Sequence, residues 1–222
     1  MKIVHISDTH GLHGHMLEEW LFEISEKECP DVIVHSGDFM QKSMNWESAI
    51  EFIDWYANLP FKNKILVPGN HDCFLQKLSE NSQLRKEFTP SNLHLLIDEA
   101  VIIDDIKFYG SPYTPAFMNW CFMLDKTQQR VHWESIPQDT AILITHGPAY
   151  GVLDQTSVAS NAGHLGCPFL KKRIQELKLK AHLFGHIHGG YGKLDINGYS
   201  AFNGSSLSEG YQVTNRPHVF TI

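Results

Sequence analysis

The sequence predicts an α/β fold of mixed type, in which two mixed β-sheets pack face to face as a sandwich with flanking helices. In the first half of the chain, short runs rich in Ile and Val alternate with helix-like segments, which is typical of parallel strands joined by crossover helices. The second half is richer in strand-like runs and contains two turn signals. No linker, repeat or low-complexity tract interrupts the chain, so we expect a single domain over residues 1–222.

The first half is expected to contain strands at 3–6, 32–34 and 65–67, with helices between them. Each helix offers one apolar stripe to a sheet, because its apolar residues recur at i, i+3, i+4 and i+7. The stripes are Leu17, Trp20, Leu21 and Ile24, then Trp46, Ala49, Ile50 and Ile53. A later helix is expected from the spacing of Leu170, Ile174 and Leu177.

Strands of the second half are expected at 101–103, 106–109, 141–145, 181–185, 194–196 and 199–202. Two hairpins should join neighbouring runs. Asn197 and Gly198 are suited to the positive φ values of a type I′ turn, and Asp104 and Asp105 hold the same position between the first two runs.

The amino-acid composition argues against some classes of function. Hydrophobic residues make up 42% of the 222 positions, enough for a full core. A net charge of -7 argues against extended nucleic acid as a partner, and no apolar run approaches the roughly 20 residues of a membrane span. Met1 and Lys2 lead straight into a strand without an export signal, so a cytoplasmic location is expected. The four cysteines lack paired spacing and are interpreted as reduced thiols.

Polar side chains follow five of the predicted strands at the point where each strand ends. Because ligands bind beyond the carboxyl ends of the strands in such sheets, we expect these five tips to converge on one pocket. The tips are Asp8-Thr9-His10-Gly11, Gly37-Asp38, Gly69-Asn70-His71-Asp72, Thr145-His146-Gly147 and Gly185-His186-Ile187-His188-Gly189.

Two pairs in these tips have i, i+2 spacing, Asp8 with His10 and His186 with His188, so each pair projects to one side of an extended segment. Carboxylate, amide and imidazole groups together suit Mn²⁺, Fe²⁺, Zn²⁺ or Co²⁺. Seven candidate ligands exceed the needs of one ion, and two ions roughly 3.5 to 4 Å apart would use them all, with Asp38 as the bridge. The seven are Asp8, His10, Asp38, Asn70, His146, His186 and His188.

The ordered set D-x-H, G-D, G-N-H-D, T-H-G and G-H-x-H resembles the calcineurin-like metallophosphoesterase family over almost the whole chain. The stretches 108–115, 185–192 and 203–205 look like the small metallophosphoesterase-domain-containing proteins within it. The resemblance implies a four-layer αββα fold. It also implies that Asp8, His10 and His188 hold a first metal, that Asn70, His146 and His186 hold a second, and that Asp38 bridges both.

The function expected is hydrolysis of a phosphate ester by a hydroxide that bridges two metal ions, with Mn²⁺ preferred. By the same resemblance His71 contacts the substrate, where it would protonate the leaving group, and Asp72 is expected to orient His71. Resemblance alone favours small phosphodiesters such as cyclic nucleotides. A general phosphomonoesterase or a nuclease stays open as the alternative, and a non-catalytic scaffold would lack ligands that this sequence retains.

Other histidines and an aromatic segment have simpler interpretations. His5, His35 and His182 lie within strands and are expected to be structural, while His13 and His15 are expected to face solvent. The segment 113–122 could form an aromatic wall for a nucleobase or a packed loop over the core. His164 could reach the substrate from its loop or remain an exposed loop residue.

Overall fold

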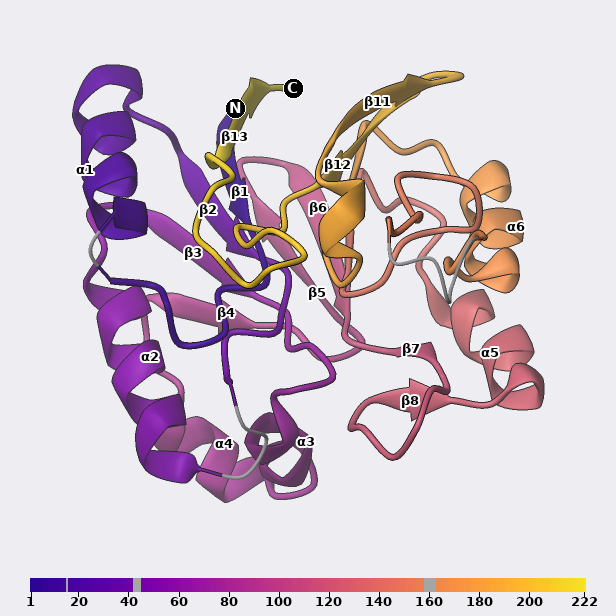
Figure 1. Ribbon diagram of the computed structural model, residues 1–222, viewed down its shortest axis with the longest axis horizontal. Helices are drawn as coiled ribbons and strands as arrows, with labels where there is room; N and C mark the ends of the chain where they lie inside the picture. Colours follow the sequence, from indigo (N-terminus) through magenta and orange to yellow (C-terminus); the bar gives the residue numbers. More distant parts are fainter. Residues whose placement is uncertain (15, 42–44, 158–162) are drawn as a thin grey trace.

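The computed structural model describes residues 1–14, 16–41, 45–157 and 163–222, and it forms two β-sheets that pack between helices (Figure 1). The first sheet has the order β13-β1-β2-β3-β4, in which β1 to β4 are parallel and β13 is antiparallel to β1. Its strands are β1 (Lys2–Ile6), β2 (Val32–His35), β3 (Asn63–Leu66), β4 (Leu93–Leu95) and β13 (His218–Thr221). The sequence did not predict β4 or β13.

The second sheet has the order β11-β12-β10-β9-β6-β5. The inner pairs are parallel, and antiparallel hairpins form both edges. Its strands are β5 (Glu99–Ile103), β6 (Ile106–Ser111), β9 (Ile142–Thr145), β10 (Ala181–Phe184), β11 (Gly192–Ile196) and β12 (Tyr199–Asn203). Two short strands, β7 (Thr114–Pro115) and β8 (Met123–Leu124), pair separately.

Helices cover the outer face of each sheet, which confirms the predicted four layers. α1 and α2 lie against the first sheet, and α5 and α6 lie against the second (Figure 1). The described helices are α1 (Met16–Glu28), α2 (Trp46–Asn58), α3 (Cys73–Ser79), α4 (Ser82–Phe88), α5 (Lys126–His132) and α6 (Pro168–Glu176). Short 3-10 turns, η1 (Trp133–Ser135) and η3 (His188–Gly190), follow α5 and β10.

Three apolar clusters fill the spaces between the layers. Alternate residues of one strand serve different clusters: Ile3 packs between the sheets with Phe108, whereas Val4 packs outward with Leu21 of α1. The third cluster joins the outer face of the second sheet to Trp133 and helix α6. This period-2 division is the expected consequence of a strand buried on both faces.

Both predicted hairpins form, but their turns differ. Asp104 and Asp105 both have positive φ, 47° and 63°, as a type I′ turn requires. In the other hairpin Gly198 alone of its pair has a positive φ, of 100°, so the predicted type I′ turn at Asn197-Gly198 is wrong. Gly198 occupies the one position of this turn that has a positive φ, so Asn197 does not adopt a left-handed conformation.

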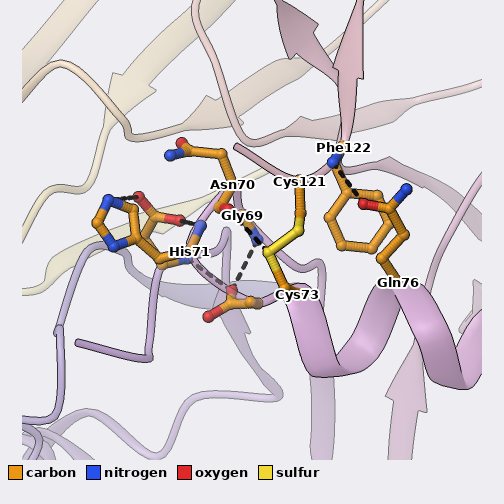
Figure 2. The surroundings of a disulfide bond; sticks show 9 residues. Gly69, Asn70, His71, Cys73, Gln76, Cys121 and Phe122 are labelled. Carbon is orange, nitrogen blue, oxygen red and sulfur yellow. Dashed lines mark hydrogen bonds and ion pairs between the residues drawn. A yellow bond between two sulfur atoms is a disulfide. The ribbon is translucent and has the colours of Figure 1, made fainter. Parts of the chain in front are cut away.

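The expectation of four reduced cysteines is wrong for two of them. Cys73 and Cys121 form a disulfide with their Cα atoms 5.3 Å apart, although they are separated by 48 positions in the sequence. Cys73 begins α3, and Cys121 lies in the loop before β8, so only the tertiary fold brings them together (Figure 2). Cys29 is free and exposed, and Cys167 is free and buried.

The three strand histidines are buried and hydrogen-bonded, as predicted for structural residues. His5 contacts the Ser36 hydroxyl at 2.9 Å, His35 contacts that of Thr9 at 3.1 Å, and His182 contacts that of Thr145 at 2.8 Å. Burial lowers the pKa of His182 from 6.5 to about 3. The unfolded chain therefore takes up a proton at His182 below about pH 6.5, whereas the folded protein does so only near pH 3.

The pH dependence of folding should reflect this difference. Stability is expected to fall as the pH drops below 6.5, and His182→Gln should reduce the loss between pH 7 and 5 by about 2 kcal/mol, since one depressed pKa is removed. Urea unfolding of the metal-free protein at the two pH values measures this. An equal loss in both proteins would contradict the assignment.

Candidate metal centre

The five polar strand tips converge at one edge of the sandwich. Asp8, Asp38 and Asn70 follow the adjacent parallel strands β1, β2 and β3, and His146 and His186 follow the adjacent strands β9 and β10. A bridge between Ser7 and Ser205 and a hydrogen bond from the Ser206 amide to the Ser7 carbonyl, 2.7 Å, tie the chain after β12 to this edge. The predicted convergence is confirmed for all five tips.

Asp38 lies at the centre of the cluster. Its Oδ2 is 3.2 Å from His146 Nε2, 3.9 Å from His10 Nε2 and 4.0 Å from His71 Nε2. Three groups of potential ligand atoms, each within 4.8 Å of one another, overlap here: Asp8 with His10 and His188, His10 with Asp38 and His71, and Asp38 with His146 and His186. The Asn70 side-chain oxygen joins them at 3.0 Å from His146 Nε2. The structure thus brings together all seven predicted ligands.

The histidine rings are held so that one nitrogen faces the cluster. Nδ1 of His10, His146 and His188 lies 3.1, 2.9 and 3.0 Å from the backbone carbonyls of Met40, Ser36 and Ser208 respectively. A carbonyl only accepts, so each Nδ1 carries a proton and Nε2 is the nitrogen left to bind an ion.

Histidine ligands of protein metals have this arrangement. His10 Nε2 is also buried with no hydrogen-bond partner among the described residues, an arrangement that costs free energy unless the atom is coordinated. The residues therefore fit divalent ions.

Asp8 is fixed by the His186 backbone and by Ser205, whose functional role no sequence pattern indicated. The Ser205 hydroxyl donates to Asp8 Oδ2 at 2.9 Å, and the His186 amide donates to the same oxygen at 2.9 Å. The Asn203 side-chain oxygen accepts the Ser205 amide at 3.1 Å, which fixes the position of Ser205. The Asn-Gly-Ser stretch at 203–205 was a sequence signal for these contacts, but nothing in it identified Asp8 as the partner.

Four of the seven predicted ligands have left-handed backbone conformations. The φ angles are 51° at Asp8, 42° at His10, 55° at Asp38 and 68° at His186. Such conformations cost about 1 to 3 kcal/mol each for residues other than glycine and gather at functional sites. The surrounding sheets hold the backbone in these conformations, which aim the four side chains at one centre.

Burial and mutual charge set the protonation of the two inner histidines. Burial lowers the pKa of His146, but the adjacent Asp38 carboxylate outweighs this and raises it to about 9. Burial, assisted by His146, lowers the pKa of His186 to about 4. A cation at this position would take the place of the His146 proton beside Asp38, since metal binding competes with protons for the same lone pairs.

Asp72 does not orient His71 as expected. Its carboxylate accepts backbone N–H groups from Gly69 at 2.7 Å, Asp38 at 2.9 Å and Met40 at 3.0 Å, and these use both oxygens. Among the described residues, His71 Nδ1 has no hydrogen-bond partner, so the Asp72 carboxylate does not hold the His71 ring. Asp72 therefore fixes the backbone at Asp38, and the expectation that Asp72 orients His71 is wrong.

A pocket of about 690 Å³ opens above the cluster. His10, Asp38, Asn70 and His71 line its floor. Part of the segment 113–122 forms one wall, through Phe117, Met118 and Trp120, while Phe122 is buried in the core. The segment therefore contributes residues to the pocket wall and to the core, and the binding of a nucleobase by that wall stays a prediction. Tyr211, which no sequence pattern indicated, also lines the pocket, with its ring centroid 5.2 Å from that of His10.

The remaining candidate histidines lie apart from the cluster. His164 contacts the Asp154 carboxylate at 2.7 Å and is not among the pocket-lining residues. His13 packs against Phe52 and Trp55, so the expectation that it faces solvent is wrong. His13 packs on the aromatic surface of α2, and the spacing of residues in the sequence does not indicate that contact. His15 lies outside the described residues.

A sandwich of two sheets with histidine and carboxylate side chains gathered at its strand tips is typical of metal-dependent hydrolases. The family model of calcineurin-like phosphoesterases matches residues 1–190, so the chain belongs to that family and is a phosphoric ester hydrolase. Within the described residues, no helix has the length and apolar character needed to cross a membrane.

Known proteins resemble this chain to different extents. The human metallophosphoesterase domain-containing protein 1 is 31% identical over all of this chain and 71% of its own length. A probable rhamnogalacturonate lyase C of Emericella nidulans is 33% identical over 87% of this chain, which spans only 18% of that protein. The structure of TT1561 of Thermus thermophilus has a TM-score of 0.64 at 14% identity, covering 99% of this chain and 98% of its own, and so shares the fold.

Proposed function

We propose that this protein is a phosphodiesterase that uses two metal ions, preferably Mn²⁺, to hydrolyse small phosphodiesters such as cyclic nucleotides, with residues 1–222 as one catalytic domain. The carrying observation is the shared position of Asp38. It belongs to one ligand group with His10 and His71 and to another with His146 and His186. A carboxylate between two such groups can bridge two ions.

The proposed ligands divide into two sets. Asp8, His10 and His188 hold the first ion, Asn70, His146 and His186 hold the second, and Asp38 bridges them. Two bound ions lower the pKa of water and neutralise charge on the phosphoryl oxygens. Fe, Zn²⁺ and Co²⁺ suit the same mixture of imidazole, amide and carboxylate groups.

His71 is the proposed proton donor. Its ring lines the pocket floor, and its Nε2 lies 4.0 Å from Asp38 Oδ2, at the border between the ion site and the open pocket. A leaving oxygen of an ester bound to both ions comes within reach of this nitrogen. His71 then protonates that oxygen as the P–O bond breaks.

The substrate proposal depends on the pocket. Its aromatic and apolar wall of Phe117, Met118 and Trp120 suits one flat or apolar group on the ester. A net charge of -7 disfavours extended nucleic acid, so a small ester is the proposed partner. The proposed location of the protein is the cytoplasm. The preference for diesters depends on the resemblance to the small metallophosphoesterase-domain-containing proteins, and a phosphomonoesterase or nuclease is the alternative.

A substrate panel tests the proposal. With Mn²⁺ present, we expect turnover of bis-p-nitrophenyl phosphate and of a 2′,3′- or 3′,5′-cyclic nucleotide to exceed that of p-nitrophenyl phosphate. Asp38→Asn, purified in the same way, controls for contaminating phosphatases. A preference for the monoester would favour the phosphomonoesterase hypothesis. A lack of turnover with every ester would favour the hypothesis of a non-catalytic scaffold.

Metal content gives a separate prediction. The protein stripped with a chelator and reloaded with Mn²⁺ should hold two ions per chain and melt at a higher temperature than the stripped protein, because ions that bind only the folded state stabilise it. Elemental analysis and thermal unfolding measure the two quantities. Saturation at one ion per chain would contradict the bridging role of Asp38.

A further inference from the structure

Trp120 lies directly against His71. Their ring centroids are 4.2 Å apart and their planes differ by 23°, so the two rings are stacked. His10 contacts the same imidazole edge-on, at 4.8 Å between ring centroids. These contacts confine the imidazole between the pocket wall and the ion site.

In the part of the chain that the structure describes, no hydrogen bond orients the His71 ring through Nδ1. Nδ1 of His71 is buried without a hydrogen-bond partner among the described residues, and Asp72 accepts from backbone groups instead. Three of the four proposed ligand histidines, His10, His146 and His188, differ in this respect, since a carbonyl fixes each of them. The orientation of His71 therefore depends on ring packing, chiefly on Trp120.

The position of Trp120 depends in turn on the next residue. Cys121 is bonded through sulfur to Cys73 at the start of α3, and its amide donates to the Asn70 carbonyl at 3.2 Å. The Phe122 amide donates to the Gln76 side chain at 2.9 Å (Figure 2). In Figure 2 the disulfide joins the segment that carries His71 to the segment that carries the pocket wall. It adds a covalent cross-link between the two segments.

We propose that the Cys73–Cys121 disulfide and Trp120 position His71 for proton donation, and that opening the disulfide slows the reaction. Trp120, Cys73 and Cys121 are positioning residues, because they act through His71. This inference rests on the proposed function. Reduced cytosolic surroundings would keep such a bond partly open, and disulfides found in that compartment are commonly redox-sensing.

The redox step is simple. A trialkylphosphine attacks one sulfur, the S–S bond breaks, and water supplies one oxygen and two protons, giving two thiols and the phosphine oxide. Two electrons pass from phosphorus to the disulfide. Cys29 and Cys167 are already free and take no part.

The kinetic test uses two diaryl phosphates, bis-p-nitrophenyl phosphate and diphenyl phosphate, which differ in their para-nitro groups. The hydrolysis of each by the Mn²⁺-loaded protein is measured before and after reduction. Reduction should lower kcat about tenfold for diphenyl phosphate, whose leaving group needs a proton, and much less for the nitrophenyl ester. Reoxidation should restore the rate. Trp120→Ala should show the same contrast without reductant, and Trp120→Phe, which keeps a stacked ring, should lose less.

Matched variants identify the thiols involved. Cys73→Ser/Cys121→Ser should resemble the reduced protein and ignore the phosphine, whereas Cys29→Ser should respond as the unaltered protein does. Metal content should stay the same throughout. In the metal-free protein, reduction should change tryptophan fluorescence, and this change should be missing in Trp120→Phe. The fluorescence therefore reports the packing of Trp120 and does not depend on turnover.

Two kinds of failure are distinguishable. If the oxidised protein hydrolyses both diesters but reduction and Trp120→Ala leave their rate ratio unchanged, the positioning role is wrong while the proposed function stands. If reduction releases metal or slows both esters equally, the disulfide supports the fold or the ion site, which also overturns the inference. If the oxidised protein hydrolyses neither ester, the proposed function fails, and an unchanged fluorescence on reduction would then overturn the inference separately.

Discussion

Asp38→Asn is expected to lower hydrolysis by at least about 10³-fold while the protein stays folded. Asparagine keeps the oxygen that accepts the His71 amide at 2.7 Å, so the loop retains its backbone contact. It loses the negative charge that His146 Nε2 approaches at 3.2 Å and that two proposed ions share. The effect should therefore fall on the ions and leave the core intact.

Steady-state kinetics, elemental analysis and thermal unfolding of Asp38→Asn separate these effects. Asp31→Asn is the matched control, because Asp31 precedes the same strand, β2, at its opposite end, where it accepts the Lys2 amide at 2.7 Å. The control should keep both activity and metal. Hydrolysis retained by Asp38→Asn with two ions bound would count against the bridging role.

His71→Ala should lower the maximal rate by roughly 10² to 10⁴ while metal content stays nearly intact, as expected for loss of a general acid. The loss should depend on the leaving group. Release of p-nitrophenolate needs little protonation, whereas a ribose alkoxide needs much more. The variant should therefore be impaired less on bis-p-nitrophenyl phosphate than on a cyclic nucleotide.

The same two substrates provide the control for His71→Ala. His188→Ala, which removes a proposed ligand held by the Ser208 carbonyl, should lose metal and slow both substrates alike. If His71→Ala also loses metal, or slows both substrates equally, His71 is a ligand or a phosphate-binding group and another residue protonates the leaving oxygen.

The convergence of the cluster could be predicted because it follows from local rules. Asp8, Asp38 and Asn70 each stand just after a parallel strand, and parallel strands end at one edge of a sheet. Alternation of strand-like runs with helix-like segments indicated parallel strands joined by crossover helices, which suggested the layers. The division of ligands between two ions and the role of His71 remain predictions.

Contacts between distant segments could not be predicted in the same way. The hydroxyl of Ser205 reaches Asp8 across 197 positions, and Cys73 reaches Cys121 across 48. Strand β4 has only three residues, so it shows no period that distinguishes it from a loop. Asp72 stands beside His71 in the sequence yet points to the backbone of another loop. Each of these outcomes depends on tertiary packing, which a one-dimensional pattern does not contain.

The carbonyl groups that hold the rings of His10, His146 and His188 affect which ion the protein takes up. A cavity whose donor atoms are already in place cannot adjust to the radius of its guest, and its donors suit several first-row metals of similar size. Selection among those metals would then depend on their supply as well as on the preference of the site. The element recovered with the purified protein would reflect both.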